Sequence, residues 1–321
     1  MDNKTILITG GTGSLGNALT KYLLDHTHIQ KLIILSRDEL KQFEMSQEFN
    51  HDSRLRFFLG DVRDVDRLYR AFEGVDYIIH AAALKQVPSC EYNPFEAVKT
   101  NILGAQNVIE AAIDRKVKKV MAVSTDKAAQ PLNLYGVTKA CMEKLFIQAN
   151  AYSPRGGTKF SVARYGNVVG SRGSVIPFFK NLAHTGKLPI THPDMTRFWI
   201  TLEQAVQFIL KYLHLMQGRE VFVPKIPSMK IMDLAEAICP GCEKDIVGIR
   251  PGEKLHELLF TKDEARRTID ADCYIITPEF SWTDNEPDFN GVFVPPDFEY
   301  CSGTNDRWLS KEELEEMICQ V

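Results

Sequence analysis

Short apolar runs rich in β-branched residues recur through the first half of this 321-residue chain and predict strands. Longer segments with helical spacing lie between several of them, notably Phe95–Lys116 and Tyr135–Tyr152. Because strand, helix and strand in this order form right-handed crossovers, the pattern predicts a doubly wound α/β fold with a parallel sheet. The predicted strands are Thr5–Thr9, Leu32–Leu35, Leu55–Leu59, Tyr77–His80, Val120–Ser124 and Phe160–Arg164.

The alternation weakens after about Gly166, where prolines separate shorter helices such as Leu202–Met216 and Met229–Ile238. We therefore expect a Rossmann-type domain over residues 1–166 and mainly a smaller substrate-binding domain over residues 167–321. A return of some later segments to the first domain stays open. The last helix is expected to begin at Ser310, because Ser310 and Glu313 have the spacing of a capping box.

The composition, 44% hydrophobic and 25% charged, is that of an ordinary globular protein. A formal net charge of −4 with dispersed lysines and arginines argues against a nucleic-acid partner. We find no secretory signal and no stretch of membrane-spanning length. Seven cysteines without framework spacing suit a reducing compartment, so the cytoplasm is the expected location.

A glycine-rich loop follows the first predicted strand and opens a helix. Gly10, Gly13 and Gly16, with Ser14 and Leu15 between the last two, have the spacing of a dinucleotide-binding loop. Glycine allows the tight turn and close backbone approach to a pyrophosphate, and the helix N-terminus offers free N–H groups. The setting favours a dinucleotide site over a plain turn.

The residues after the second strand select between NAD and NADP. Arg37, with Ser36 and Lys41 beside it, can form bidentate bonds to a 2′-phosphate and favours NADP. Asp38 could instead bind the ribose of NAD, and a solvated loop is the third interpretation. After the third strand, Asp61 and Val62 suit an adenine contact.

The fourth strand is followed by Ala81-Ala82-Ala83, whose small side chains let the backbone approach ribose and pyrophosphate. Further along, Tyr135 and Lys139 are four residues apart, on one helical face. A nearby ammonium favours the phenolate and lowers the pKa of tyrosine toward that of a useful base. Such a pair is often a surface pair, but its place after the fifth strand favours catalysis.

With these motifs the chain resembles the extended short-chain dehydrogenases, which oxidise sugar nucleotides transiently. Within them, Thr125-Asp126-Lys127 is similar to the signature of the inverting UDP-N-acetylglucosamine 4,6-dehydratases, where retaining dehydratases carry Asp-Glu. Other segments match the same family over nearly the whole chain. These are Ser36–Lys41, Lys85, Arg164–Val168 and Arg250–Lys254.

The resemblance implies an NADP-dependent lyase that acts on UDP-N-acetylglucosamine and inverts C5. Tyr135, held ionised by Lys139, would take the C4 hydroxyl proton. A neutral Lys127 would remove the C5 proton, and a protonated Asp126 would donate to the departing C6 hydroxyl. Thr125 would bond the sugar near its 4-hydroxyl.

The resemblance further implies that Asn167, Arg250 and Glu253 hold the UDP-sugar, and that Lys85 serves both the cofactor and the substrate. Arg250 is chemically suited to a diphosphate and Glu253 to a ribose or uracil contact. A solvent-facing turn is the alternative for these two. A homo-oligomer is expected as in the superfamily, and the pathway suggested is synthesis of a bacterial-type surface or flagellar sugar.

Two other functions stay open. A UDP-hexose 4-epimerase or dehydrogenase on the same fold would need Tyr135 and Lys139 but no base at Lys127. A non-catalytic NADP-binding protein would need neither set. Cys239 and Cys242 have the spacing of a redox or zinc half-site, but we predict no function for them because no second ligand pair or thioredoxin-like setting is found. No metal site is predicted.

Overall fold

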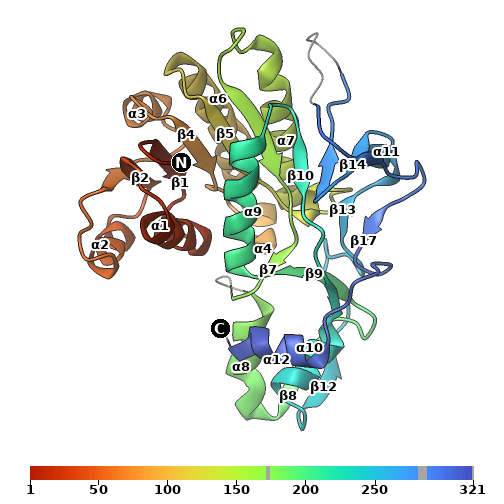
Figure 1. Ribbon diagram of the computed structural model, residues 1–321. Coiled ribbons are helices and arrows are strands. Elements are labelled where there is room, and N and C mark those ends of the chain that lie inside the picture. Colours follow the sequence, from red (N-terminus) through yellow and green to blue (C-terminus); the bar gives the residue numbers. More distant parts are fainter. Residues whose placement is uncertain (171–173, 281–287, 320–321) are drawn as a thin grey trace.

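The computed structural model describes residues 1–170, 174–280 and 288–319. A ten-stranded sheet with the order β16-β14-β15-β10-β6-β5-β4-β1-β2-β3 forms its centre (Figure 1). The strands from β10 to β3 in this order pair in parallel. At the other edge, β15, β14 and β16 pair with their neighbours in an antiparallel way. The predicted doubly wound α/β fold is confirmed, and each predicted strand is present with bounds within one residue.

The strands of the large sheet are β1 (Thr5–Thr9), β2 (Lys31–Ser36), β3 (Leu55–Leu59), β4 (Tyr77–His80), β5 (Lys119–Val123), β6 (Lys159–Ala163), β10 (Val221–Val223), β14 (Thr268–Asp270), β15 (Tyr274–Ile276) and β16 (Val292–Phe293). The helices of this part are α1 (Ser14–His26), α2 (Glu39–Glu48), α3 (Val65–Ala71), α4 (Val87–Tyr92), α5 (Pro94–Val98), α6 (Gly104–Asp114), α7 (Leu134–Tyr152), α9 (Leu202–Leu215) and α11 (Lys262–Ala265).

The central strands are continuous apolar runs. Both of their faces are buried, because helices cover both sides of the sheet. Every residue of β1 is buried, as expected for a parallel strand with two covered faces. Helices α1 and α9 pack against each other, whereas α6 packs between α3 and α7 on the other face (Figure 1). This arrangement leaves the carboxyl ends of the strands open for a ligand, at the point where the strand order reverses.

The predicted helix Phe95–Lys116 is interrupted by a π-helical turn, Lys99–Leu103, between α5 and α6. The side chain of Asn101 in this turn pairs with both backbone groups of Leu84, at 2.9 Å each. Asn101 Nδ2 also donates to Thr138 Oγ1 of α7 at 3.0 Å. The wider turn therefore connects the loop after β4 with helix α7, an arrangement common near functional sites.

A smaller lobe lies below the large sheet in Figure 1 and has an apolar cluster of its own, which includes Phe179, Trp199 and Leu234. Outside the large sheet, the strands form the sheet β11-β9-β7 and the pairs β12-β8 and β13-β17, of which β13-β17 lies beside β14 (Figure 1). The elements are β7 (Asn167–Val168), β8 (Lys187–Ile190), β9 (Thr196–Ile200), β11 (Ser228–Lys230), β12 (Glu243–Ile246), β13 (Leu258–Phe260), β17 (Tyr300–Cys301), α8 (Val175–Leu182), α10 (Ile231–Ile238) and α12 (Lys311–Cys319).

Later segments follow the predicted pattern closely. Helix α9 matches Leu202–Met216, whereas the start of Met229–Ile238 belongs to β11, which pairs with β9. The capping box is confirmed, because Ser310 N donates to Glu313 Oε2 at 2.9 Å and Glu313 N donates to Ser310 Oγ at 3.2 Å. In the described part of the chain, no helix is both long and apolar enough to cross a membrane.

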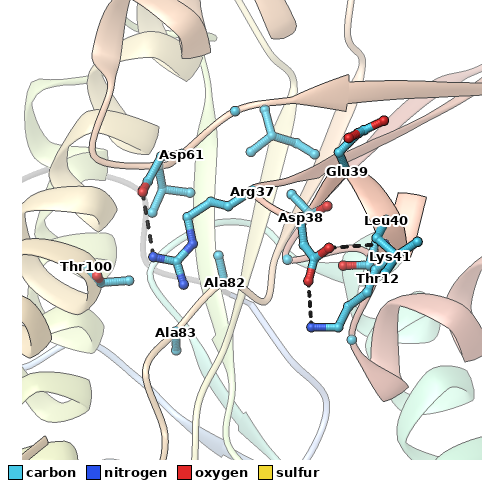
Figure 2. Close-up of a pocket in the computed structure, with 16 residues that line it drawn as sticks. Thr12, Arg37, Asp38, Glu39, Leu40, Lys41, Asp61, Ala82, Ala83 and Thr100 are labelled. Atoms are coloured by element: carbon cyan, nitrogen blue, oxygen red, sulfur yellow. Dashed lines mark hydrogen bonds and ion pairs between the residues drawn. The ribbon is translucent and has the colours of Figure 1, made fainter. Parts of the chain in front are cut away.

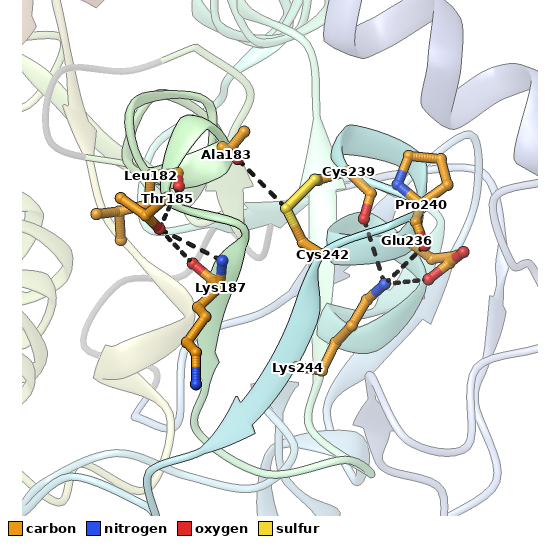
Figure 3. Close-up of a disulfide and its surroundings, with 9 residues drawn as sticks. All are labelled: Leu182, Ala183, Thr185, Lys187, Glu236, Cys239, Pro240, Cys242 and Lys244. Atoms are coloured by element: carbon orange, nitrogen blue, oxygen red, sulfur yellow. Dashed lines mark hydrogen bonds and ion pairs between the residues drawn. A yellow bond between two sulfur atoms is a disulfide. The ribbon is translucent and has the colours of Figure 1, made fainter.

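Cys239 and Cys242, for which the sequence predicted no function, form a disulfide at the end of α10 (Figure 3). The turn at Pro240-Gly241 returns the chain so that the two Cα atoms lie 5.4 Å apart, a distance typical of disulfides. Lys244 Nζ holds the turn by donating to Cys239 O at 3.2 Å.

Candidate active site

A cavity of about 880 Å³ opens at the carboxyl ends of β1 to β4 (Figure 2). The loops after these four strands contribute its walls, as predicted from the glycine loop and the residues after β2 and β3. Thr100, which the sequence analysis did not single out, lines the cavity from the π-helical turn. The lining residues are Gly10, Thr12, Gly13, Leu35, Ser36, Arg37, Asp38, Glu39, Leu40, Lys41, Gly60, Asp61, Val62, Ala82, Ala83 and Thr100.

Two of the loop glycines are required by the backbone. Gly10 has a φ of +65°, and a Cβ atom there would lie 2.9 Å from the backbone of Ala82. A Cβ atom at Gly16 would collide with the Gly11 carbonyl. Ser14 and Leu15 begin α1, and in the described structure no side chain caps this helix at Gly13 and no acid lies in its first turn. Its N–H groups therefore suit an anion.

Arg37 and its neighbours form the rim of the cavity. Figure 2 shows the guanidinium of Arg37 extending toward Asp61, with Nη1 3.7 Å from Asp61 Oδ2. Asp38 caps α2 and pairs with Lys41 Nζ at 2.8 Å, so its carboxylate is engaged within its own loop. The Ser36 hydroxyl is buried and accepts a hydrogen bond from Gln42. Arg37, by contrast, is more than half exposed.

Tyr135 and Lys139 lie in the first turns of α7, but their contacts differ from the expectation. Lys139 Nζ donates to Val123 O at 2.6 Å, and burial lowers the pKa of Lys139 to about 8. Desolvation raises the pKa of Tyr135 to about 12, against the opposing effects of Lys127 and a hydrogen bond with Thr125. The expected lowering of the Tyr135 pKa by Lys139 is therefore not found.

Asp126 and Lys127 form a short 3-10 turn, Asp126–Ala128, directly after β5. Asp126 is buried, and its Oδ1 lies 3.0 Å from Lys127 Nζ and accepts from Thr125 Oγ1 at 2.9 Å. Burial alone would lower the pKa of Lys127, but the Asp126 and Glu257 carboxylates outweigh it and raise this pKa above its usual value. The lowered pKa that a neutral Lys127 was expected to require is therefore not found, and the role of Lys127 as the base stays a prediction.

The segment Arg250–Lys254 lies against the start of α7, far from it in sequence. Asn133 Nδ2 donates to Gly252 O at 2.8 Å, and Lys254 Nζ donates to Ala129 O. Arg250 is exposed, with Nη1 3.7 Å from Glu253 Oε1. The structure thus brings this segment next to the Asp126–Tyr135 region, as the resemblance implied.

Two further predicted residues lie on other segments. Asn167 begins β7, and its buried Oδ1 has no hydrogen-bond partner among the described residues. Lys85 lies in the loop between β4 and α4, where desolvation lowers its pKa. Helix α4 is tied to α7, because Leu134 N donates to Glu91 Oε1 at 2.7 Å.

Glu257 was missed by the sequence analysis. Its side chain is buried, and Oε1 lies 3.4 Å from Lys127 Nζ and 3.7 Å from Arg197 Nε. No spacing rule marks it, although it follows three residues after Lys254 of the family motif. Arg197 lies in β9 beside two core aromatics, since Phe198 and Trp199 are buried.

Comparisons with known proteins agree with this architecture. The family model described as "Polysaccharide biosynthesis protein" matches residues 6–279. UDP-N-acetylglucosamine 4,6-dehydratase (inverting) of Campylobacter jejuni is 52% identical over 99% of this chain and 98% of the relative. UDP-glucose 4-epimerase of Rickettsia typhi is 46% identical over 86% of this chain and 83% of the relative. The structure of Pen from Bacillus thuringiensis has a TM-score of 0.90 at 37% identity, covering 100% and 99% of the two chains.

The family model spans most of the chain, and the Campylobacter jejuni relative aligns along nearly all of it. The signature Thr125-Asp126-Lys127 lies beside Tyr135 at the end of β5, where the family pattern implied it. The chain therefore belongs to the polysaccharide biosynthesis protein family, among the relatives of the inverting UDP-N-acetylglucosamine 4,6-dehydratases.

Proposed function

We propose that this protein is an NADP-dependent UDP-N-acetylglucosamine 4,6-dehydratase that inverts C5. The observation that carries the proposal is the pair formed by the buried Asp126 and the half-buried Lys127, whose polar atoms are 3.0 Å apart beside Tyr135. An acid and a base next to an oxidising site are what elimination of water requires after C4 is oxidised. The similarity to the Campylobacter jejuni dehydratase supports the same chemistry.

The cavity suits a dinucleotide, which would supply a hydride acceptor for C4 and a hydride donor for C6. Gly10, Gly13 and Gly16 with the N-terminus of α1, including Ser14 and Leu15, would hold the pyrophosphate. Asp61 and Val62 would contact the adenine, and Ala81 and Lys85 the ribose and phosphates. Arg37, with Ser36 and Lys41, would bind the 2′-phosphate, which is our reason for choosing NADP over NAD.

Proton transfers are assigned to the chain's own side chains. Tyr135 takes the C4 hydroxyl proton, which requires its phenolate form. Lys139 does not lower the pKa of Tyr135, but the positive charge of an oxidised nicotinamide nearby would lower it. Lys139 holds the end of β5 through its bond to Val123 O and would contribute to holding the cofactor. Thr125 orients the C4 hydroxyl.

The elimination needs a neutral Lys127 and a protonated Asp126. Moving one proton from Lys127 Nζ to Asp126 Oδ1 along their 3.0 Å hydrogen bond produces both forms with no change in net charge. Lys127 then removes the C5 proton, and Asp126 gives its proton to the C6 hydroxyl, which leaves as water. Hydride addition at C6 and protonation at the opposite face of C5 complete the 6-deoxy-4-keto sugar.

The UDP-sugar would be held mainly by the smaller lobe. Arg250 would bind the diphosphate and Glu253 the ribose or uracil. The buried Asn167 Oδ1, unpaired among the described residues, is available to a substrate donor. Residues 1–166 would thus bind the cofactor and carry catalysis, while residues 167–321 mainly bind substrate. A cytoplasmic location and a homo-oligomer stay predictions.

A second function is favoured by one observation, the 46% identity to a UDP-glucose 4-epimerase. An epimerase would use Tyr135 and Lys139 without a base at Lys127. Incubation of the purified protein with UDP-N-acetylglucosamine separates the two, because only the dehydratase releases water and forms a 6-deoxy-4-keto sugar. A product that keeps its C6 hydroxyl would support the epimerase, and no turnover would support a non-catalytic NADP-binding protein.

Heavy water and one variant test the mechanism. The wild-type product should carry deuterium at C5 with inverted configuration, since Lys127 releases its proton to solvent. Lys127→Ala should stop water loss but keep NADP binding and a transient absorbance of reduced nicotinamide, whereas Tyr135→Phe should suppress that absorbance as well. A product that retains its C5 configuration, or full water loss by Lys127→Ala, would contradict the assignment.

A further inference from the structure

A cluster of buried and half-buried charges surrounds Lys127 on the side of the smaller lobe. Two carboxylates, Asp126 and Glu257, lie among three cations, Lys127, Arg197 and Lys254. Lys127 Nζ is 3.0 Å from Asp126 Oδ1 and 3.4 Å from Glu257 Oε1. Glu257 Oε2 lies 3.9 Å from Lys254 Nζ and, within the described ranges, makes no hydrogen bond. Lys127 therefore lies between two acids, and the proposed mechanism uses only Asp126.

The backbone of Glu257 is held rigidly in place. Glu257 N donates to Ser302 Oγ and Ser302 N donates to Glu257 O, both at 2.8 Å. Ser302 Oγ is also 2.7 Å from Thr196 Oγ1 at the start of β9. The buried position of Glu257 thus depends on three segments of the smaller lobe that are distant in sequence. A carboxylate fixed this way acts on Lys127 at a set distance.

The elimination requires that the Asp126–Lys127 pair carry one proton between its two side chains. For water loss this proton must be on Asp126, the acid, while Lys127 is neutral and acts as the base. When this proton is lost at high pH, no acid is left for the C6 hydroxyl. A group that retains the proton therefore extends activity to higher pH.

We propose that Glu257 is a positioning residue for the elimination: its carboxylate orients Lys127 and retains the proton that Asp126 and Lys127 share. The inference rests on the proposed dehydratase function. It adds a role for a residue that touches neither sugar nor cofactor in the scheme above. Glu257 acts through Lys127.

The sign of the effect follows from the charges that face Lys127. Asp126 faces it from its own turn, Arg197 from β9, Tyr135 from α7, and Lys254 and Glu257 from the segment before β13. The Asp126 and Glu257 carboxylates raise the pKa of Lys127, whereas Arg197 and burial lower it. Removing the charge of Glu257 therefore lowers the pKa of Lys127, and removing the charge of Lys254 has the opposite effect.

The test measures kcat for water loss from UDP-N-acetylglucosamine against pH in wild type, E257Q, E257D and Lys254→Gln. The alkaline limb is the part of this profile where kcat falls at high pH. In E257Q it should shift to lower pH by about one unit or more, the scale expected for a lost charge at this separation. E257D keeps the charge, so its limb should stay near the wild-type position while kcat falls. Lys254→Gln should shift the limb to higher pH.

Two measurements separate this role from simple loss of structure. The transient absorbance of reduced nicotinamide should persist in E257Q, because C4 oxidation does not use Lys127. Glu264→Gln, which removes a half-buried carboxylate paired with the buried Arg164, serves as the control and should lower thermal stability without moving the alkaline limb of the pH profile. If E257Q does not fold, the opposite shift in Lys254→Gln still tests the inference.

The outcomes are distinct. An unchanged alkaline limb in folded E257Q, or in Lys254→Gln if E257Q does not fold, would overturn the role of Glu257. Equal loss of C4 oxidation and water loss in E257Q would also overturn it. A wild-type protein that releases no water would instead refute the proposed function itself.

Discussion

Lys139 Nζ donates a 2.6 Å hydrogen bond to the carbonyl oxygen of Val123, the last residue of β5. This bond joins helix α7 to the strand end from which Thr125 and Asp126 follow. It also explains why the Lys139 ammonium does not lower the pKa of the Tyr135 phenol. The ammonium is buried with this carbonyl as its partner, and burial lowers its pKa to about 8.

The buried Lys139 predicts a pH dependence of stability. Its pKa falls from 10.5 in the unfolded chain to about 8 in the folded protein, so the unfolded chain binds more protons between these values. The free energy of unfolding should therefore rise with pH, by about 2.5 kcal/mol from this group between about pH 8 and about pH 10.5. Urea unfolding of wild type and Lys139→Met should show that the variant lacks this rise.

Lys144→Met is the matched control, because Lys144 lies on the same helix but is mostly exposed. Its free energy of unfolding should follow the wild-type pH dependence. An equal rise in Lys139→Met and wild type would show that Lys139 is not the group responsible.

Arg37 should determine the preference for NADP. Arg37→Ala should weaken NADP binding by about 1.5–3 kcal/mol, the range for hydrogen bonds to charged groups, with little effect on NAD. Fluorescence or calorimetric titration with both dinucleotides measures the difference. Arg56→Ala, an exposed arginine of β3 outside the cavity lining, should change neither affinity. Equal losses for both dinucleotides would contradict a 2′-phosphate contact.

Arg250 should bind the diphosphate of the substrate. In Arg250→Lys an ammonium replaces the fork of the guanidinium, so UDP binding should weaken by about 1.5 kcal/mol or more while NADP binding stays the same. Calorimetry with UDP alone provides the measurement. The control is Arg266→Lys, at an exposed arginine in the same part of the sequence, which should leave UDP affinity unchanged. Unaltered UDP affinity in Arg250→Lys would place Arg250 outside the site.

The disulfide between Cys239 and Cys242 should stabilise the smaller lobe under oxidising conditions only. Closing so short a loop contributes about 2 kcal/mol at most in the chain-entropy description. Cys242→Ser should therefore unfold at lower urea than wild type without reductant, and the gap should narrow when dithiothreitol reduces the wild type. Cys319→Ser, at an exposed free cysteine, should behave as wild type. A gap that reductant leaves unchanged would mean that Cys242 stabilises by packing.

Local sequence patterns predicted the scaffold well, because each depends on neighbours in the chain. Strand β1 matches its prediction because a continuous apolar run between turns forms a strand with both faces covered. Gly10 and Gly16 were identified because a positive φ and close backbone packing exclude other residues. The Ser310 capping box likewise needs only two residues three apart.

Contacts between distant segments limited the other predictions. The Phe95–Lys116 helix contains a π-helical turn because Asn101 pairs with Leu84 across the fold. Tyr135 and Lys139 share a helical face, as their spacing predicts, but Val123 decides where the ammonium points. Burial, which no short motif reports, then sets the pKa values of both groups in directions that the pairing by itself does not predict.

The sequence by itself determined the parallel α/β fold, the dinucleotide loop and the residue types of the candidate site, since periodicity, glycine geometry and motif spacing are local properties. Only the tertiary structure decided the electrostatic state of that site. Glu257 reaches Lys127 through pairing of β13 with β17 and packing beside β9, and its carboxylate, together with that of Asp126, raises the pKa of Lys127. The physical reason is that Coulomb interactions depend on distance in space and on burial, which folding alone sets.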